Sequence, residues 1–289
     1  MPRAVPPRLD RTARLLGLEA VAALARAHVA VLGLGGVGSF TAEALARAGV
    51  GRLTLVDGER VHETNANRQL HALDGEFGRW KSEVMAERLR RASPAARIEA
   101  VCEPYGEVNA ERLLPPGLSF AVDAMDTVVA KLHALARCRA LGIPVVTVLG
   151  AARRLDPTAV RVSDLAETHC DPMARDVRKY LRTRHGLVPG AGGSGILAVW
   201  SVEPPRPALA LPGDEEGVPG ARRRAPGERR REPKVFGSVA FATGAFGLAA
   251  AAAVVHRLTG VAPAPGRELG ESVRARRRRD VAARAVRRG

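Results

Sequence analysis

A glycine-rich segment between an apolar run and an alanine-rich stretch carries the strongest chemical signal in the sequence. Gly33, Gly35 and Gly38 fit the spacing G-x-G-x-x-G, and Gly36 adds a fourth glycine. Such glycines allow a tight turn and a close approach to phosphate, whose charge the following helix N-terminus favours. Asp57 ends the next predicted strand, where a carboxylate would bind a ribose hydroxyl. The pattern alone indicates a nucleotide, most often NAD or FAD.

A second group of residues points away from a dehydrogenase. Asn65, Asn67 and Arg68 follow shortly after the ribose-binding acid, Lys81 begins a predicted helix, and Asp126 follows a predicted strand. Hydride transfer needs none of them, because the nicotinamide carries that chemistry. Reaction at a nucleoside triphosphate needs cations to neutralise the polyphosphate and a carboxylate to hold Mg²⁺ against it. The ordered set therefore predicts ATP and Mg²⁺.

Alternating strands and helices are predicted to position these residues. The predicted strands are 28–33, 52–57, 97–101, 119–123 and 144–149, and the predicted helices are 39–48, 81–92 and 127–141. Further along, strands at 160–164 and 196–201 would flank a charged helix at 171–184. This βαβ alternation predicts an α/β fold with a doubly wound, mostly parallel sheet and helices on both faces.

The later part of the chain changes character. Residues 203–234 are rich in proline and arginine and are predicted to form a disordered loop. Residues 235–260 are predicted to form an apolar helix that closes the same domain. The alanine- and glycine-rich run 235–255 is only weakly hydrophobic, which favours packing inside the domain over insertion into a membrane. That run has the length of a membrane span, so membrane association is the less favoured alternative. Residues 261–289 form an arginine-rich tail.

The formal net charge of the chain is +15, and most of it lies in the loop and the tail. These two stretches either contact nucleic-acid phosphates or are merely solvated, so the charge is compatible with an RNA partner without identifying one. The three cysteines, Cys102, Cys138 and Cys170, are too few and too scattered for a disulfide framework and lack CxxC spacing. The N-terminus has no secretory signal pattern, so a cytoplasmic location is expected.

Several longer motifs extend these signals. They are RTARLLG at 11–17, GLGGVGSF at 33–40, TNANRQLHAL at 64–73, VDAMDT at 122–127, DPTAVRVSDLAET at 156–168 and GSVAFATGAFGLAAA at 237–251. With them the sequence resembles the ubiquitin-activating-type adenylating superfamily of ThiF, MoeB and HesA, and most of all its tRNA threonylcarbamoyladenosine dehydratase branch. The resemblance implies a Rossmann-like ThiF-type fold, with residues 1–202 as the ATP-binding adenylation domain.

The resemblance also implies a role for each candidate residue. The glycine loop would face the ATP phosphates, Asp57 the ribose, and Asn65 or Asn67 with Arg68 the polyphosphate. Lys81 would reach the phosphates near the reacting centre. Asp126 would hold Mg²⁺, with Asp123 behind it. Arg11 matches an arginine that reaches the neighbouring subunit's ATP site in family dimers, although it could equally be a surface charge on an N-terminal helix.

The reaction implied by the resemblance is activation of a carboxylate. The threonyl carboxylate of threonylcarbamoyladenosine in tRNA would attack the α-phosphate of ATP, and an internal nucleophile would then displace AMP and close a ring. The implied partners are tRNA, a second copy of the chain and, less firmly, a sulfur-transfer protein. The alternative within the superfamily is an adenylating enzyme for a ubiquitin-like sulfur carrier, for which Cys170 is the only plausible acceptor. An NAD-dependent oxidoreductase and a non-catalytic RNA-binding protein are the alternatives from other classes.

Overall fold

The computed structural model describes residues 6–187, 193–209 and 236–261. A seven-stranded sheet with the order β3-β2-β1-β4-β5-β7-β6 forms its centre. Its strands are β1 (His28–Leu32), β2 (Arg52–Val56), β3 (Arg97–Val101), β4 (Phe120–Asp123), β5 (Val145–Val148), β6 (Val160–Asp164) and β7 (Leu197–Ser201). All neighbours pair in parallel except β6 with β7. The predicted mostly parallel sheet is confirmed.

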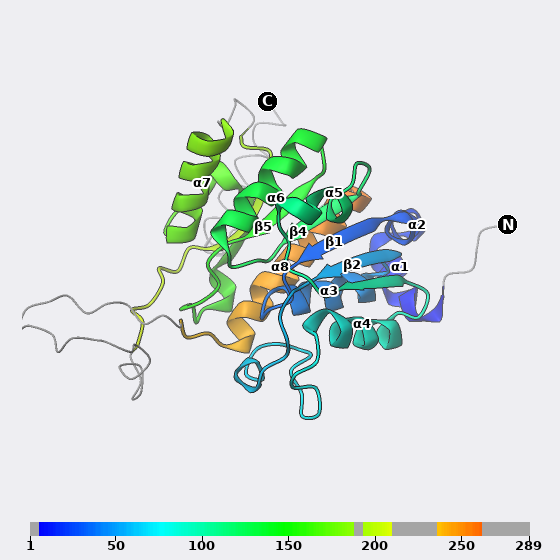
Figure 1. The fold of residues 1–289 in the computed structure, drawn as a ribbon. Helices are drawn as coiled ribbons and strands as arrows, with labels where there is room; N and C mark the ends of the chain where they lie inside the picture. Colours follow the sequence, from blue (N-terminus) through cyan, green and yellow to red (C-terminus); the bar gives the residue numbers. More distant parts are fainter. Residues whose placement is uncertain (1–5, 188–192, 210–235, 262–289) are drawn as a thin grey trace, which may run out of the picture.

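Helices cover both faces of this sheet, as Figure 1 shows with α5, α6 and α7 above it and α3 and α4 below. The α-helices are α1 (Asp10–Leu16), α2 (Leu18–Arg26), α3 (Gly38–Ala48), α4 (Lys81–Ala92), α5 (Ala110–Leu113), α6 (Val128–Leu141), α7 (Pro172–His185) and α8 (Ala240–Thr259). Short 3-10 helices lie at Pro7–Leu9, Glu63–Asn65, Glu107–Asn109, Pro157–Ala159 and Leu165–Glu167. The predicted strands and the predicted helices 39–48, 81–92, 127–141 and 171–184 agree with these bounds to within one residue at each end, whereas the predicted closing helix 235–260 begins only at Ala240.

Two apolar cores hold the layers together. In β1, Val29 and Val31 belong to the core shared with α3, α4 and α8, whereas Ala30 and Leu32 belong to the core shared with α5, α6 and α7. Successive side chains of a strand point to opposite faces, so a strand covered on both faces must be apolar throughout. This requirement explains the unbroken apolar run of β1 in the sequence.

Helix α8 returns to the half of the domain that contains the glycine-rich segment and packs against α3. A Cβ at Gly247 would lie 2.4 Å from the carbonyl oxygen of Val37, and one at Gly244 would lie 3.1 Å from the ring of Phe40. The glycines therefore permit a backbone approach that other residues would block. The predicted closing helix is confirmed over residues 240–259.

The membrane alternative concerns this same helix. The helix is long and apolar enough to cross a membrane by length and composition, since its most apolar 18-residue window has a mean hydropathy of 1.4, but 56% of that window is buried inside the domain. Packing within the domain therefore accounts for its apolar composition. Most of the predicted disordered loop, residues 210–234, the first residue of the predicted closing helix and nearly all of the predicted tail, residues 262–289, lie outside the described residues.

Candidate active site

The candidate site lies at the carboxyl ends of β1, β2 and β4. From β1 the chain builds the sheet toward β2 and β3, and it then crosses to β4 on the other side of β1. Ligands of open α/β sheets bind outside the carboxyl ends of the strands at such a reversal of strand order. The glycine loop follows β1 there, and the Asp126 loop follows β4.

Three glycines of the loop are required by close contacts. Gly33 has a φ of +86°, and a Cβ on it would lie 2.9 Å from the carbonyl oxygen of Ala124. A Cβ on Gly38 would lie 1.9 Å from the carbonyl oxygen of Gly33, and one on Gly36 would lie 3.0 Å from Oγ1 of Thr243. By contrast, a Cβ on Gly35 would have only Gln69 Nε2 within 4 Å, at 3.9 Å. Gly35 therefore leaves the loop backbone open to a ligand.

Asp57 is buried at the end of β2 and is oriented by two backbone donors. Its Oδ2 accepts a hydrogen bond from Leu34 N at 2.7 Å, and its Oδ1 accepts one from Glu59 N at 2.8 Å. Burial raises the pKa of the Asp57 carboxyl, while the backbone donors and the nearby Lys81 ammonium oppose that rise. Each carboxylate oxygen has two acceptor positions, so both can still accept a hydroxyl. The geometry suits the ribose role predicted for Asp57.

Lys81 is the first residue of α4, and its side chain is only 4% exposed. Its Nζ lies 2.5 Å from Oε2 of Glu59, whose own side chain is 74% exposed. The Glu59 carboxylate is exposed enough to turn into solvent, but the buried Lys81 ammonium then needs another anion as its partner. The Lys81 ammonium can therefore exchange Glu59 for a phosphate.

Arg68 and Asn67 form a polar surface beside the glycine loop. Arg68 Nη1 donates to Asn67 Oδ1 and to the carbonyl oxygen of Thr64, both at 2.9 Å, and Asn67 Nδ2 donates to the carbonyl oxygen of Ser238 at 2.9 Å. Asn65 is buried, and its Oδ1 accepts from His62 N at 3.0 Å. Of the two asparagines, Asn65 therefore shapes the turn, and Asn67 is the one exposed beside Arg68.

The two aspartates of the loop after β4 have different environments. Asp123 is fully buried, and its Oδ2 accepts from Lys131 Nζ at 2.7 Å and from Thr147 Oγ1 at 2.6 Å. Asp126 is exposed, and Thr127 Oγ1 is 3.4 Å from its Oδ1. Within the described residues there is no group of three or more His, Cys, Asp or Glu that could hold a metal ion. A single exposed carboxylate nevertheless fits Mg²⁺, which commonly takes one carboxylate together with substrate phosphates and water.

Two buried polar residues of the same region were not predicted as site residues. Gln69 lies beside Gly35, and its Oε1 has no hydrogen-bond partner within the described part of the chain. His71 is 1% exposed, and neither of its ring nitrogens has a partner there. Burial and the nearby Lys81 cation lower the pKa of His71 to about 4. Both residues lie in the segment 64–73 that supplies Asn67 and Arg68, and this proximity is the signal that could have identified them.

Arg11 does not join the other candidates within this chain. It is exposed on α1, and the 3-10 helix just before α1 places Leu9 against Gly49, which ends α3. Arg8 of that 3-10 helix donates to the carbonyl oxygen of Ala92 at the end of α4. Both helices begin at the candidate site, so Arg11 lies near the opposite edge of the sheet.

The three cysteines do not form a cluster at the site. Cys138 is buried, and burial raises the pKa of its thiol to about 12. Cys102 is half-buried beside the hydroxyl of Ser82. Cys170 is exposed in the turn before α7, where its backbone has a φ of +53°. Cys170 is therefore the accessible thiol of the described chain.

Comparisons with known proteins identify chains of similar sequence and fold. Residues 9–276 match the ThiF family. The tRNA threonylcarbamoyladenosine dehydratase of Escherichia coli K12 is 44% identical over 197 residues, which are 68% of this chain and 74% of that protein. The crystal structure of E. coli tRNA N6-threonylcarbamoyladenosine dehydratase, TcdA, in complex with ATP has a TM-score of 0.75 and 37% identity, covering 88% of this chain and 94% of that chain.

A relative that acts on a sulfur carrier matches less of the chain. The sulfur carrier protein ThiS adenylyltransferase of E. coli K12 is 32% identical over 133 residues, which are 46% of this chain and 52% of that protein. Identity and coverage are both greater for the dehydratase.

Proposed function

Because the chain belongs to the ThiF family, we propose that it is an ATP-dependent tRNA threonylcarbamoyladenosine dehydratase. The observation that carries this proposal is 44% identity to a named dehydratase in a chain whose Asp57, Arg68, Lys81 and Asp126 lie in the segments that follow β2 and β4, at the edge of the sheet that carries the glycine loop. The enzyme would act in the cytoplasm on tRNA that carries threonylcarbamoyladenosine.

The proposed first step is transfer of the adenylyl group. An oxygen of the threonyl carboxylate attacks the α-phosphorus of ATP, and the bond from that phosphorus to the pyrophosphate oxygen breaks. Arg68 and Lys81 would bind the phosphates and offset the negative charge that builds up there. Asp126 would hold Mg²⁺, which neutralises polyphosphate charge when bound. The N-terminus of α3 adds its partial positive charge behind Gly35.

The proposed second step closes the ring. A nucleophile of the modified nucleoside attacks the activated carbonyl carbon, the bond to AMP breaks, and the nucleophile loses its proton. The nucleoside loses one water overall, and ATP becomes AMP and pyrophosphate. Since the attacking group belongs to the substrate, the enzyme needs no cysteine nucleophile and contributes positioning and charge stabilisation.

Cys170 separates this proposal from activation of a sulfur carrier. Only a route through an enzyme-bound acyl or sulfur group would need that exposed thiol. A Cys170→Ala variant should therefore convert the modified tRNA at the wild-type rate. Loss of turnover in this variant, with its thermal stability unchanged, would favour the thiol-dependent route.

The proposed assembly is a homodimer in which Arg11 completes the partner's ATP site. Leu15 and Leu18, near Arg11 on α1 and α2, are 81% and 60% exposed, and Phe241 and Leu248 on α8 are each 54% exposed. Helices α2 and α8 pack together, and exposed apolar side chains of this number favour burial against another surface. Mixing an Arg11→Ala chain with an Asp126→Ala chain should restore activity, since one site of the mixed dimer has both residues.

The decisive experiment is incubation with threonylcarbamoyladenosine-containing tRNA, ATP and Mg²⁺. Mass analysis of the digested nucleosides should show the loss of one water from the modified adenosine, with one AMP formed per conversion. Unchanged nucleoside in the presence of folded, ATP-binding protein would refute the proposed function.

A further inference from the structure

Helix α7 carries a row of cations that the proposed chemistry does not use. Ala174, Val177 and Leu181 form its buried face. Arg175, Lys179 and Arg182 are exposed at positions i, i+4 and i+7, so they share one solvent-facing side of the helix. We call these three residues the α7 cationic face. Neighbouring members are about 4.5–6 Å apart along the helix axis.

The charge of this face is largely unpaired. The nearest acid is Asp176, whose Oδ1 lies 3.6 Å from Arg175 Nε, and the side chains of Arg175 and Asp176 are 73% and 46% exposed. An ion pair of that kind contributes little free energy. Lys179 and Arg182 have no acidic partner within the described ranges, and the nitrogen of Lys179 lies 5.4 Å from the ring centroid of Tyr180. The face is therefore available to an external anion.

The helix dipole does not explain these cations as a group. Cations in the last turn of a helix are favourable, and Arg182 lies in that turn. Arg175 is the fourth residue of α7, near the N-terminus, where the dipole disfavours a positive charge. The i, i+4, i+7 row therefore extends into a part of the helix where a cation has an electrostatic cost.

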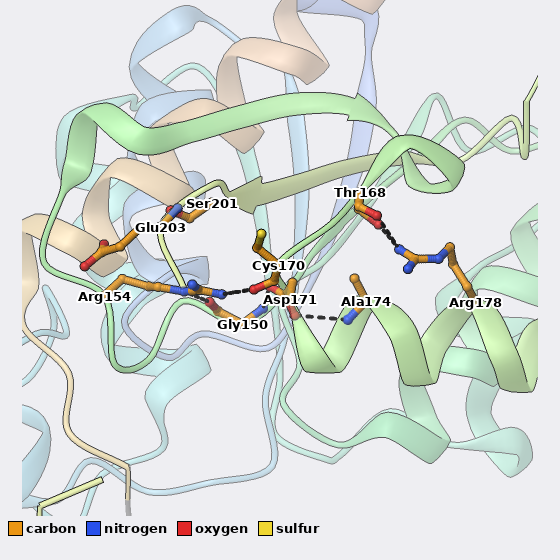
Figure 2. Close-up of polar contacts among 9 residues, drawn as sticks. All are labelled: Gly150, Arg154, Thr168, Cys170, Asp171, Ala174, Arg178, Ser201 and Glu203. Carbon is orange, nitrogen blue, oxygen red and sulfur yellow. Dashed lines mark hydrogen bonds and ion pairs between the residues drawn. The ribbon is translucent and has the colours of Figure 1, made fainter. Parts of the chain in front are cut away.

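A network of polar contacts fixes α7 to the edge of the sheet that carries the candidate site (Figure 2). Asp171 caps the helix, with Oδ1 accepting from Ala174 N at 3.0 Å. Its Oδ2 accepts from Gly150 N at 3.1 Å, just beyond β5, and lies 3.5 Å from Nη2 of the buried Arg154. Arg178 Nη1 donates to the carbonyl oxygen of Thr168 at 2.9 Å. Since β5 pairs with β4, which leads to Asp126, α7 begins at the same edge as the site.

We propose that the α7 cationic face binds the phosphate backbone of the tRNA whose modified adenosine occupies the candidate site. This inference rests on the proposed function. Contacts to phosphate position a nucleic acid without reading its sequence, and they need cations on a rigid element. Positions 176 and 183 beside the row are Asp and Thr, so the face lacks the apolar centre of a protein interface. Figure 1 shows α7 as the outermost helix of its layer.

The test compares two triple variants with the same change in charge. The first is Arg175→Gln, Lys179→Gln and Arg182→Gln, in which glutamine keeps a high helix propensity. The control replaces Arg26, Arg91 and Arg97 with glutamine, because these exposed residues lie where α2 and α4 end and β3 begins, at the opposite edge of the sheet. Binding of modified tRNA is measured from 0.05 to about 0.3 M salt, after circular dichroism has shown that both variants are folded.

The α7 variant should bind modified tRNA about 10-fold or more weakly at 0.1 M salt. The slope of log K against log salt should fall by about 2–3 in magnitude, close to one for each phosphate contact removed. The control should keep the wild-type affinity to within about 2-fold and keep the slope. An unchanged slope in the α7 variant, or an equal loss in the control, would overturn the proposal. Failure of the wild-type protein to convert the tRNA would refute the proposed function instead, and the binding comparison would still decide the role of α7.

Discussion

Replacing Lys131 with methionine should destabilise the domain far more than an average substitution. Lys131 Nζ lies 2.7 Å from Asp123 Oδ2, 2.9 Å from the carbonyl oxygen of Val148 and 3.2 Å from Thr147 Oγ1. Neither partner of the ion pair has any exposed side-chain surface. Methionine fills a similar volume but leaves the Asp123 carboxylate buried without a counter-charge.

The size of the effect follows from that burial. Removing one partner of a buried ion pair costs about 3–5 kcal/mol, because the remaining charge is left uncompensated. At about 2–4 °C per kcal/mol for a domain of this size, Tm should fall by about 6–20 °C. The same substitution at an exposed lysine should change stability by less than about 0.5 kcal/mol.

Urea denaturation followed by circular dichroism measures the effect, and a second variant tests its cause. The double variant Lys131→Met, Asp123→Asn has no buried charge at this site. In the native domain Met125 N donates a hydrogen bond to Asp123 Oδ1 at 3.2 Å, and the amide oxygen of the new asparagine can still accept it. The double variant should regain at least half of the lost free energy of unfolding. A single variant within about 1 kcal/mol of wild type, or a double variant as unstable as the single one, would refute the reasoning.

Three further predictions address the site. Asp126→Asn should lower turnover more than about 100-fold. Its Tm should stay within about 2 °C of wild type, because the Asp126 side chain is exposed. Near-wild-type turnover of this variant would show that Asp126 does not have its assigned role. Gly38→Ala places a Cβ 1.9 Å from the carbonyl oxygen of Gly33, so calorimetry should show ATP binding weakened at least about 10-fold, and an unchanged Kd would contradict this. The pKa of His71 is lowered from 6.5 to about 4 in the folded state, so the unfolded chain binds the extra proton first as pH falls. Stability should therefore fall by about 3 kcal/mol between pH 6.5 and 4, and a His71→Leu variant should lose that pH dependence.

The sequence was sufficient to predict the sheet and its glycine loop because their signals are local. A strand buried on both faces must be apolar at its buried positions, as Val29–Leu32 of β1 are, and a helix that begins at Lys81 or ends before Gly49 is marked by adjacent residues. The antiparallel pairing of β6 with β7 has no comparable local signal.

The environments of the site residues depended on contacts that are distant in the sequence. Asp123 and Asp126 are three residues apart, yet Lys131 and Thr147 bury one of them while the other stays exposed. Likewise, the glutamate that pairs with Lys81 comes from the turn after β2, 22 residues earlier. Residue type and spacing predict which groups converge, but burial by other elements decides which of them can reach a ligand.

The contacts of α8 make the order of synthesis important for this enzyme. Thr41 Oγ1 donates to the carbonyl oxygen of Gly247 at 3.0 Å, and Asn67 donates to that of Ser238, so segments near residues 40 and 240 are adjacent in the finished domain. Until α8 has left the ribosome, the apolar face of α3 is exposed and the glycine loop lacks its contacts with α8. We therefore expect the contacts around the glycine loop to be complete only after α8 has left the ribosome, and until then the chain exposes apolar surface of the kind that chaperones recognise.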